Sequence, residues 1–504
     1  MTARLIGGEM LVWSDLDGRH GPPPVRAAAL RPLLGVAAGR TLVAGPHAAD
    51  LIDALPAEQM TLLVRGLPDA DTLTDRYADR PGVTVLCGSL EKVAAAPAYD
   101  TVIALDGLGR LRSAEDDAAE ESWAEDLALL VAVLRPGGRL LLGLENLFGL
   151  HRILVPAAEP GDADWGTADA YDPARPAGPA QLRATLREAG LTVVRDYAAF
   201  PSPADPAVLL GGELLADDAV RGFVAATVRA ACVPQEGVLA DPRRLATGAL
   251  RAGIAAELAP AWFVLAQRGP GEVLDTPAGV VADGPVADVV RRDADGRWTR
   301  GGVAVAAGRP LDELLLAASL RRDLPGLREL LTAWQSGAAA GVPADRIVAG
   351  ADGTLTPLAP ASGSPAGDPL VALRGLAAMM IGDGHAYLWP APADEAELTA
   401  LLAAMAGREV EASAVPAASA GPGVPALREL IMERDRLARE LAEARARHEW
   451  YEKMLTGREA ELKRVRRINA VLRATLPGRA ATASVGGLRA GKRAARAVIR
   501  RLRG

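Results

Sequence analysis

The sequence predicts a doubly wound α/β domain, followed by an α+β domain, a linker, a coiled coil and a basic amphipathic tail. Six short apolar runs between residues 41 and 194 alternate with segments of helical periodicity. These runs are apolar on both faces, which is typical of parallel strands that helices cover on both sides. A seven-residue apolar repeat that begins at residue 427 predicts the coiled coil.

The first domain is expected to span residues 1–205. Its strand-like runs are TLVA (41–44), MTLLV (60–64), VTVLC (83–87), DTVIAL (100–105), RLLLGL (139–144) and LTVV (191–194). The helix-like segments between them are AADLIDAL, residues 69–80, SWAEDLALLVAVL and PAQLRATLREAG. Ligands of doubly wound sheets bind beyond the carboxyl ends of the strands. The candidate site residues are therefore those that directly follow each strand.

Residues 206–410 give weaker signals and predict an α+β domain. Residues 310–337 have helical periodicity, whereas residues 261–268 and 286–293 resemble strands. Asp352-Gly353 is a typical hairpin turn between two short apolar runs. Residues 411–426 are rich in Ala, Ser, Pro and Gly, as linkers are.

Residues 427–476 have apolar side chains at two positions of every seven. One column contains Leu430, Leu437, Ala444, Tyr451, Val465 and Leu472, with Arg458 as an exception. The other column contains Leu427, Leu441, Leu455, Leu462 and Leu476, with His448 and Asn469 as polar members. This 3.5-residue repeat predicts a coiled coil and hence a homo-oligomer, and an Asn in such a seam commonly fixes register. The alternative is a single solvated helix.

Residues 479–504 predict a helix that lies on an anionic membrane surface. Between 485 and 503, apolar side chains recur at helical spacing among seven Arg and Lys residues, without an acid. Nucleic acid is a weaker alternative, because this tail has no aromatic side chain on which bases would stack. A disordered, solvated tail is the third possibility.

The charge distribution supports this division of the chain. The net charge is −7, but residues 424–504 contain 21 basic and 9 acidic side chains, so the remainder is strongly acidic. Only Cys87 and Cys232 are present, and their spacing excludes a disulfide framework or a zinc site. We find no signal peptide and no apolar stretch of about 20 residues. A cytoplasmic protein is expected, with a peripheral location on the inner face of the membrane as an extension.

The most specific string of the chain is LRPGGRLLLGLENLFGLHRI, residues 134–153. Here the sequence resembles the class I S-adenosylmethionine (SAM)-dependent methyltransferases. It resembles most a bacterial subgroup with the motif ENRxGLKY, several members of which are linked to cell-surface polysaccharides. YDTVIALDGLG (99–109) and the segment from 178 to 203 also fall in register, so the resemblance covers residues 18–205. It implies a Rossmann-like fold, SAM as cofactor and methyl transfer to a glycan or related acceptor.

The resemblance assigns the cofactor site to seven residues: Gly45, His47, Arg65, Gly88, Ser89, Leu90 and Asp106. Three positions depart from the family's pattern. Gly45-Pro46-His47 replaces a Gly-x-Gly loop, Arg65 replaces the acid that binds the ribose, and Ser89 replaces an acid at the adenine. Arginine has no acceptor for a hydroxyl hydrogen. Losing two or three such hydrogen bonds, at about 1.5–3 kcal/mol each, would weaken binding about a hundredfold or more.

Other residues near these positions leave alternatives open. One alternative is that Asp50, Asp69 or Asp71 replaces the missing acid from a nearby turn. Glu145, Asn146 and His151 are candidates for the acceptor pocket, although Glu145 and Asn146 would equally cap the turn that follows them. No residue is singled out as catalytic, because methyl transfer depends mainly on proximity and orientation. The leading function is thus a SAM-dependent methyltransferase of the surface-glycan kind, and the alternative is a non-catalytic scaffold tethered by its coiled coil and tail. A third option is a glycan-processing assembly partner whose middle domain binds a phosphorylated ligand.

Overall fold

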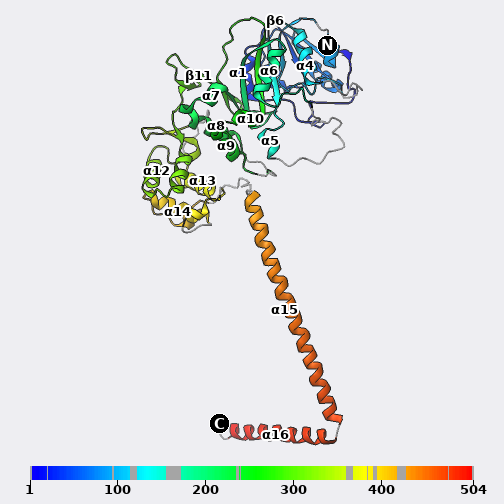
Figure 1. The fold of residues 1–504 in the computed structure, drawn as a ribbon, viewed down its shortest axis with the longest axis vertical. Coiled ribbons are helices and arrows are strands. Elements are labelled where there is room, and N and C mark those ends of the chain that lie inside the picture. The colour runs from blue at the N-terminus through cyan, green and yellow to red at the C-terminus, as the bar shows by residue number, and fades with distance from the viewer. Residues whose placement is uncertain are drawn as a thin grey trace. The chain divides into compact units, whose positions relative to one another are not determined.

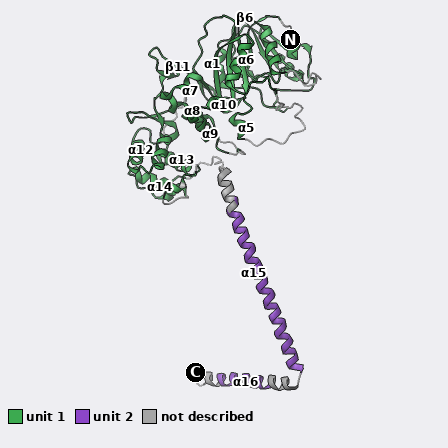
Figure 2. Ribbon diagram, viewed as in Figure 1, with its two compact units in different colours: residues 1–426 green, residues 427–504 purple. Residues whose placement is uncertain are grey.

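The structure is a computed structural model that describes residues 3–19, 21–93, 96–113, 122–154, 172–233, 238, 240–358, 367–382, 384–389, 394–416, 427–474 and 476–501. The chain forms two compact units, residues 1–426 and residues 427–504 (Figure 2). Most of the expected linker, residues 417–426, lies outside the described residues, as do Thr475 and the last three residues of the tail.

Unit 1 is built on a 13-stranded sheet, in the order β1-β4-β3-β2-β5-β6-β9-β7-β8-β10-β11-β12-β13. The strands are β1 (Arg4–Gly7), β2 (Arg40–Ala44), β3 (Gln59–Val64), β4 (Val83–Gly88), β5 (Tyr99–Ala104), β6 (Leu134–Glu145), β7 (Leu191–Phe200), β8 (Val208–Gly211), β9 (Ala261–Arg268), β10 (Gly279–Asp283), β11 (Val286–Arg292), β12 (Trp298–Arg300) and β13 (Val303–Ala304). From β1 to β6 all neighbours are parallel, and from β6 to β13 all neighbours are antiparallel.

The six strands expected in the first domain are present as β2 to β7. The chain runs outward from β2 to β3 and β4, then returns to β5 and β6 on the other side of β2. The order therefore reverses between β2 and β5, the kind of switch point at which doubly wound sheets bind ligands. This mixed α/β architecture agrees with the doubly wound, Rossmann-like sheet that the sequence predicts.

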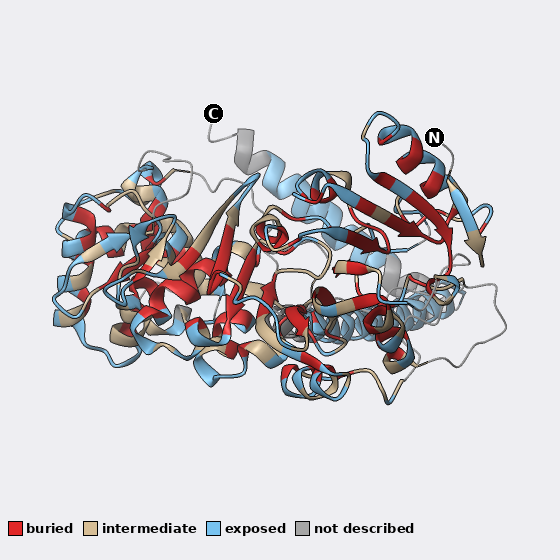
Figure 3. Ribbon diagram, turned by 90° about the horizontal axis from the view of Figure 1, so that it is seen from above, coloured by how far each residue is buried: buried red, intermediate tan, exposed pale blue. Residues whose placement is uncertain are grey.

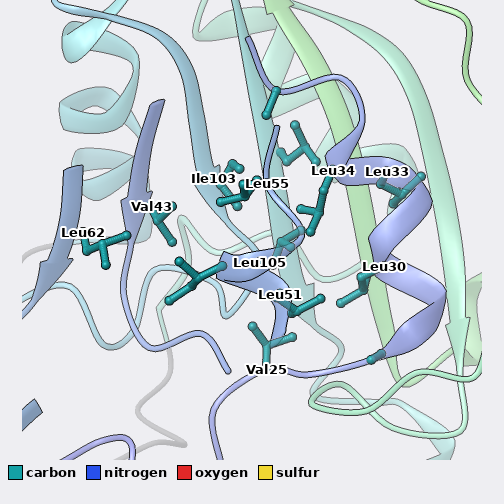
Figure 4. Close-up of a cluster of buried hydrophobic side chains, with 14 of the residues drawn as sticks. Val25, Leu30, Leu33, Leu34, Val43, Leu51, Leu55, Leu62, Ile103 and Leu105 are labelled. Carbon is teal, nitrogen blue, oxygen red and sulfur yellow. The ribbon is translucent and has the colours of Figure 1, made fainter. Parts of the chain in front are cut away.

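The helices of unit 1 lie partly on the two faces of this sheet and partly, as α11 to α14, beside a separate small sheet (Figure 1). They are α1 (Arg31–Leu34), α2 (Ala49–Asp53), α3 (Leu67–Arg76), α4 (Trp123–Val133), α5 (Leu150–Ile153), α6 (Pro179–Glu188), α7 (Gly212–Ala216), α8 (Arg221–Ala231), α9 (Pro242–Ala252), α10 (Ala255–Leu258), α11 (Leu311–Leu320), α12 (Leu324–Ser336), α13 (Pro369–Gly382) and α14 (Glu395–Met405). Val43 packs with α1, α2 and α3 on one face, whereas its neighbour Leu42 packs with α4 and α6 on the other. Figure 4 shows the first cluster around Val43, Leu62 and Leu105. Alternate side chains of one strand thus enter two cores.

The boundary expected at residues 205/206 does not separate two compact units. β9 lies between β6 and β7, with Leu141 opposite Leu265 and Tyr197 opposite Phe263. Seven of its eight residues are buried, because AWFVLAQR is apolar on both faces and needs cover on both. Figure 3 shows that buried residues, in red, are concentrated in the strands. Residues 206–304 therefore extend the first sheet.

The remainder of unit 1 contains a small sheet, β14 (Arg309–Pro310), β15 (Ile347–Ala349) and β16 (Leu355–Pro357), next to helices α11 to α14. The expected hairpin joins β15 to β16, with Gly353 at φ +81° and the Thr354 N–H donating to Asp352 Oδ1 at 3.0 Å. The helical segment expected over residues 310–337 is divided into two helices, because Arg322 adopts φ +55° and Asp323 caps the second.

Unit 2 consists of α15 (Leu427–Ala474) and α16 (Leu476–Arg501). The first helix ends at Ala474, and Pro477 lies in the first turn of the second helix, where a missing N–H is tolerated. Pro477-Gly478 therefore lies in the first turn of α16 and is not a loop between the two helices. Within the described part of the chain, no helix combines the length and apolar character that a bilayer crossing needs.

Candidate functional site

His47 fills the switch point between β2 and β5. Gly45 adopts φ +87° and turns the chain out of β2, which places the buried His47 ring beside the end of β5. The Leu105 N–H donates to His47 Nε2 at 3.1 Å, so Nδ1 carries the proton that faces the Gly45 carbonyl at 3.0 Å. Burial lowers the pKa of His47 to about 4, and the ring is neutral near pH 7. Both ring nitrogens are therefore used within the protein.

Arg65, at the end of β3, forms a bidentate ion pair with Asp15. Its Nε and Nη2 lie 2.7 and 2.8 Å from the two carboxylate oxygens, and Nη1 donates to the Arg112 carbonyl at 3.0 Å. The side chains of Arg65 and Asp15 are only 10% and 3% exposed. Burial alone would raise the pKa of Asp15, but the hydrogen bonds and charge of Arg65 hold it below its usual value. The residue at the expected ribose position is thus committed to a partner from the same chain.

Asp15 belongs to a segment, residues 10–17, that crosses the carboxyl end of β3; we call it the strap. The Met10 N–H donates to the Arg65 carbonyl at 2.9 Å, and the Leu67 N–H donates to the Met10 carbonyl at 3.0 Å. A Cβ atom on Gly66 would lie 2.2 Å from the Trp13 carbonyl oxygen, so only glycine fits beneath the strap. The strap therefore packs against the backbone of the expected cofactor groove without a gap.

Asp69 also holds the strap. Its carboxylate accepts from Ser14 Oγ at 2.5 Å and from the Asp15 N–H at 2.7 Å. Burial raises the pKa of Asp69, against the effect of these hydrogen bonds. Asp69 is one of the three acids proposed from the sequence as a substitute for the missing ribose ligand. Its oxygens instead satisfy donors of the strap.

The expected adenine position after β4 is filled as well. Gly88 adopts φ +142°, and the Ser89 N–H donates to the Gly7 carbonyl of β1 at 2.9 Å. The Ser113 N–H donates to Ser89 Oγ at 2.6 Å, and the Leu90 N–H donates to the Leu111 carbonyl at 2.8 Å. Residues 88–90 are thus bonded to β1 and to the loop that follows β5.

Asp106, at the end of β5, pairs with Arg110. Asp106 Oδ2 accepts from Arg110 Nε at 2.7 Å, and Arg110 Nη2 donates to the other oxygen. Arg110 Nη1 also donates to the Pro22 carbonyl at 2.7 Å. Burial raises the pKa of Asp106 to about 6, although the Arg110 charge opposes this shift. Arg110 follows Asp106 by four residues, a spacing that sequence reasoning did not use.

A cavity of about 750 Å³ lies beyond the carboxyl ends of β5, β6 and β7. This volume is within the range of small-molecule sites, about 300–1,000 Å³. Its apolar wall includes Trp123, Leu144, Phe200 and Phe263, and its charged wall includes Asp106, Arg110, Glu145, His151, Arg152 and Arg175. Of the seven expected cofactor residues, only Asp106 lines this cavity. Gly45, His47, Arg65, Gly88, Ser89 and Leu90 do not line it, although His47 bonds to the Leu105 N–H next to Asp106.

Glu145 and His151 of the expected acceptor pocket meet in this cavity. Glu145 Oε1 accepts from Arg152 Nε at 2.8 Å and contacts His151 Nε2 at 2.9 Å. Burial would raise the pKa of Glu145, but the hydrogen bonds with His151 and Arg152 dominate and lower it to about 2. A carboxylate that stays ionised in this way orients the two neighbouring side chains.

Asn146 has a structural role. It is buried, Nδ2 donates to the carbonyls of Glu257 and Ala259 at 2.6 and 2.8 Å, and Oδ1 accepts the Phe148 N–H at 3.0 Å. These hydrogen bonds fix the turn between β6 and α5. This agrees with the alternative interpretation of the sequence, in which Asn146 caps the turn that follows it. Among the described residues, no group of three His, Cys, Asp or Glu side chains is placed to hold a metal ion.

Comparisons with known proteins find similarity only among solved structures. No protein family matches the sequence, and no curated protein is significantly similar to it. The CurJ carbon methyltransferase is 12% identical over 47% of this chain and 50% of its own length, with a TM-score of 0.25. A complex of the Haloferax volcanii Trm112 methyltransferase activator with a putative methyltransferase is 15% identical over 51% of this chain and 92% of its own length, with a TM-score of 0.29. The N-methyltransferase NodS from Bradyrhizobium japonicum WM9 is 10% identical over 48% of this chain and 91% of its own length, with a TM-score of 0.26.

Because these similarities are low, what this chain binds must be inferred from its own contacts. The residues at the family's cofactor positions do not fit SAM. Arg65 offers donors where the ribose hydroxyls need acceptors, and its donors are bonded to Asp15 and Arg112. The strap lies across the end of β3, where the ribose would bind.

Proposed function

We propose that this protein is a non-catalytic scaffold with a methyltransferase-like fold, in which the strap replaces the nucleoside part of SAM. The observation that carries the proposal is the buried ion pair between Arg65 and Asp15. Ribose hydroxyls can reach the end of β3 only if this pair opens and the strap leaves. A scaffold of this kind retains the sheet as a rigid body and does not catalyse methyl transfer.

The free energy needed to move the strap away from β3 explains why SAM would not displace it. Separating a buried ion pair leaves a charge without compensation, which costs about 3–5 kcal/mol. The hydrogen bonds of Met10 and Ser14 with β3 and α3 would be lost in addition. Even if separation of the ion pair were the only free-energy cost, the cofactor would bind about 10²–10⁴-fold more weakly than in a preformed site.

Calorimetry with the full chain tests this proposal. We expect no heat of binding when SAM or S-adenosylhomocysteine is added to about 100 μM, an upper limit that corresponds to a binding free energy near 5–6 kcal/mol. Thermal unfolding with the same ligands gives an independent readout, because a ligand that binds the native state raises the midpoint. Micromolar binding of either compound would show that the strap does not exclude the cofactor.

The second candidate function is SAM-dependent methyl transfer, with a cell-surface glycan or related molecule as acceptor. It is favoured by one observation: Asp106 and Gly107 line the large cavity, next to Glu145 and His151. A cofactor would then have to bind in the cavity and away from residues 88–90. In that case Asp106→Asn should abolish micromolar SAM binding, whereas Asp17→Ala, which changes an exposed residue outside the cavity, should leave it intact.

Membrane tethering through α16 completes the scaffold proposal. The helix contains no acidic residue, and its described side chains Val485 and Leu488 are exposed. Apolar side chains beside arginines favour the interface of an anionic bilayer, with about 1 kcal/mol from each basic residue near the surface. The full chain should bind vesicles that contain phosphatidylglycerol and should not bind phosphatidylcholine vesicles. A variant without residues 479–504 that still binds the anionic vesicles would disprove the tether.

A further inference from the structure

The long helix α15 exposes an apolar seam. It contains 48 residues, which corresponds to a length of about 72 Å. Along it, the apolar side chains of the heptad columns are about half exposed: Leu437 52%, Leu441 52%, Leu455 64%, Leu462 54%, Val465 54% and Leu472 44%. Helices in water are stabilised mainly by packing of an apolar face. A seam with this spacing packs against another helix of the same spacing.

The charged residues beside the seam indicate which helix packs against it. With Leu441 at position a and Leu437 at position d of the heptad, the g positions include Glu440, Arg447 and Glu461. The e positions include Arg445, Glu452 and Arg466. Side chains at e and g decide partner and orientation in coiled coils. All six are exposed along α15.

We propose that α15 pairs with α15 of a second copy of this chain as a parallel, in-register, two-stranded coiled coil. In that arrangement each g residue faces the e residue that lies five positions further along the second copy. The facing pairs are Glu440 with Arg445, Arg447 with Glu452, and Glu461 with Arg466, and two-fold symmetry doubles each pair. The remaining g–e pairs, such as Met454 with Glu459, place no like charges together.

An antiparallel pair satisfies these charges less well. In the antiparallel register of greatest overlap, Leu427 faces Leu472, and g residues face g residues. Glu440 then faces Glu461, which is repulsive, and only Arg445 with Glu452 remains attractive. Glu440 and Glu452 also lie near Arg436 and His448 of their own helix, at 3.8 and 3.4 Å, but these weak exposed contacts do not depend on orientation.

The polar members of the seam point to two strands in parallel register. In the proposed dimer Asn469 faces Asn469 of the second copy, where the two amides bond to each other, whereas in the antiparallel register it would face Leu430. An Asn at an a position commonly fixes register and oligomer state. Arg434 at an a position and Arg458 at a d position can both extend their guanidinium groups to water from the narrow seam of two strands. The inference goes beyond the proposed scaffold function and does not depend on it.

Disulfide cross-linking of the full chain tests orientation and register. Leu437→Cys and Val465→Cys each place a thiol at a d position, and the two sites are 28 residues or about 42 Å apart along the helix. In the parallel register both variants should cross-link to a dimer under mild oxidation. The matched controls are Arg439→Cys and Arg467→Cys, two residues further on and facing away from the seam. The native Cys87 and Cys232 are buried.

Charge reversal provides the second test. The triple variant E440R/E452R/E461R makes every facing pair repulsive and should raise the dimer dissociation constant about a hundredfold. Adding R445E/R447E/R466E makes every pair attractive again and should restore the dimer. Light scattering reports the result, since the dimer has twice the 52.2 kDa mass of the chain.

Each outcome bears on the proposal directly. Cross-linking at both d positions, together with restoration by the sixfold variant, supports it. A monomeric wild-type chain, a trimer or tetramer, cross-linking at only one of the two d positions, or failure of the restoring substitutions would overturn it. Helix content measured by circular dichroism accompanies each variant, so that a loss of the dimer is not confused with a loss of α15.

Discussion

Removal of the Asp15 carboxylate should destabilise unit 1 strongly. In Asp15→Ala, Arg65 keeps its bond to the Arg112 carbonyl but loses both bonds to the carboxylate, and Trp13 Nε1 loses an acceptor at 3.0 Å. The buried guanidinium is then left without an opposite charge, which costs about 3–5 kcal/mol. Urea unfolding followed by tryptophan fluorescence measures the change in the free energy of unfolding. Asp17→Ala, in an exposed position of the same segment, should change it by less than about 0.5 kcal/mol.

The double variant Asp15→Ala/Arg65→Leu makes the reasoning refutable. Because it removes the unpaired charge as well, it should be more stable than Asp15→Ala alone. The pH dependence gives a further check. Arg65 lowers the pKa of Asp15 in the folded state, so the pair stabilises fully above about pH 4 and its contribution declines as the pH falls further. An Asp15→Ala cost below about 1 kcal/mol, or a cost that is the same at pH 3 and pH 7, would contradict a buried ion pair.

Three other perturbations test the packing around the groove and the cavity. His47 has a folded-state pKa of about 4, below its unfolded value near 6.5, so His47 alone should contribute a loss of about 3 kcal/mol between pH 6.5 and pH 4. Thermal unfolding should show that His47→Gln loses less stability than the wild-type chain over this range by about this amount. Gly66→Ala should lower the unfolding midpoint through its clash with Trp13, at a cost of about 1–3 kcal/mol, whereas Gly178→Ala, in open space, serves as the control and should change little. Asn146→Ala should cost about 2 kcal/mol or more in urea unfolding, because two carbonyls and one N–H lose their partner; a smaller cost would indicate that water replaces the amide.

Much of the sheet could be predicted because each strand carries its own signal. The runs that became β2 to β7 are apolar on both faces, and this property is visible in a single segment. The position of β9 was not visible, because its partners are distant in sequence: Leu140 faces Ala266, and Ala198 faces Trp262. AWFVLAQR was recognised as a strand, but no local pattern shows that it enters the sheet of the preceding 200 residues.

The candidate site was predictable only in part, for a similar reason. Arg65 and Ser89 could be identified as poor cofactor ligands from their chemistry alone. What replaces the cofactor could not be identified, because residues 10–17 have no periodicity and Asp15 is 50 positions from Arg65. Arg175 of the cavity was missed for the same reason, because it donates to the Glu145 carbonyl across 30 positions. Such contacts depend on tertiary structure and leave little trace in a local motif.

The strap has a consequence for the order in which this protein folds during synthesis. Residues 4–17 leave the ribosome before their partners are made, since Leu5 pairs with Cys87 of β4 and Ser14 bonds to Asp69. For the time that the ribosome needs to add these residues, several seconds at about 5–20 residues per second, the segment has nothing to bind. Until residues 4–17 pack against β3 and β4, that end of the sheet is open. The groove is therefore accessible for a short time during biosynthesis and is closed in the finished fold.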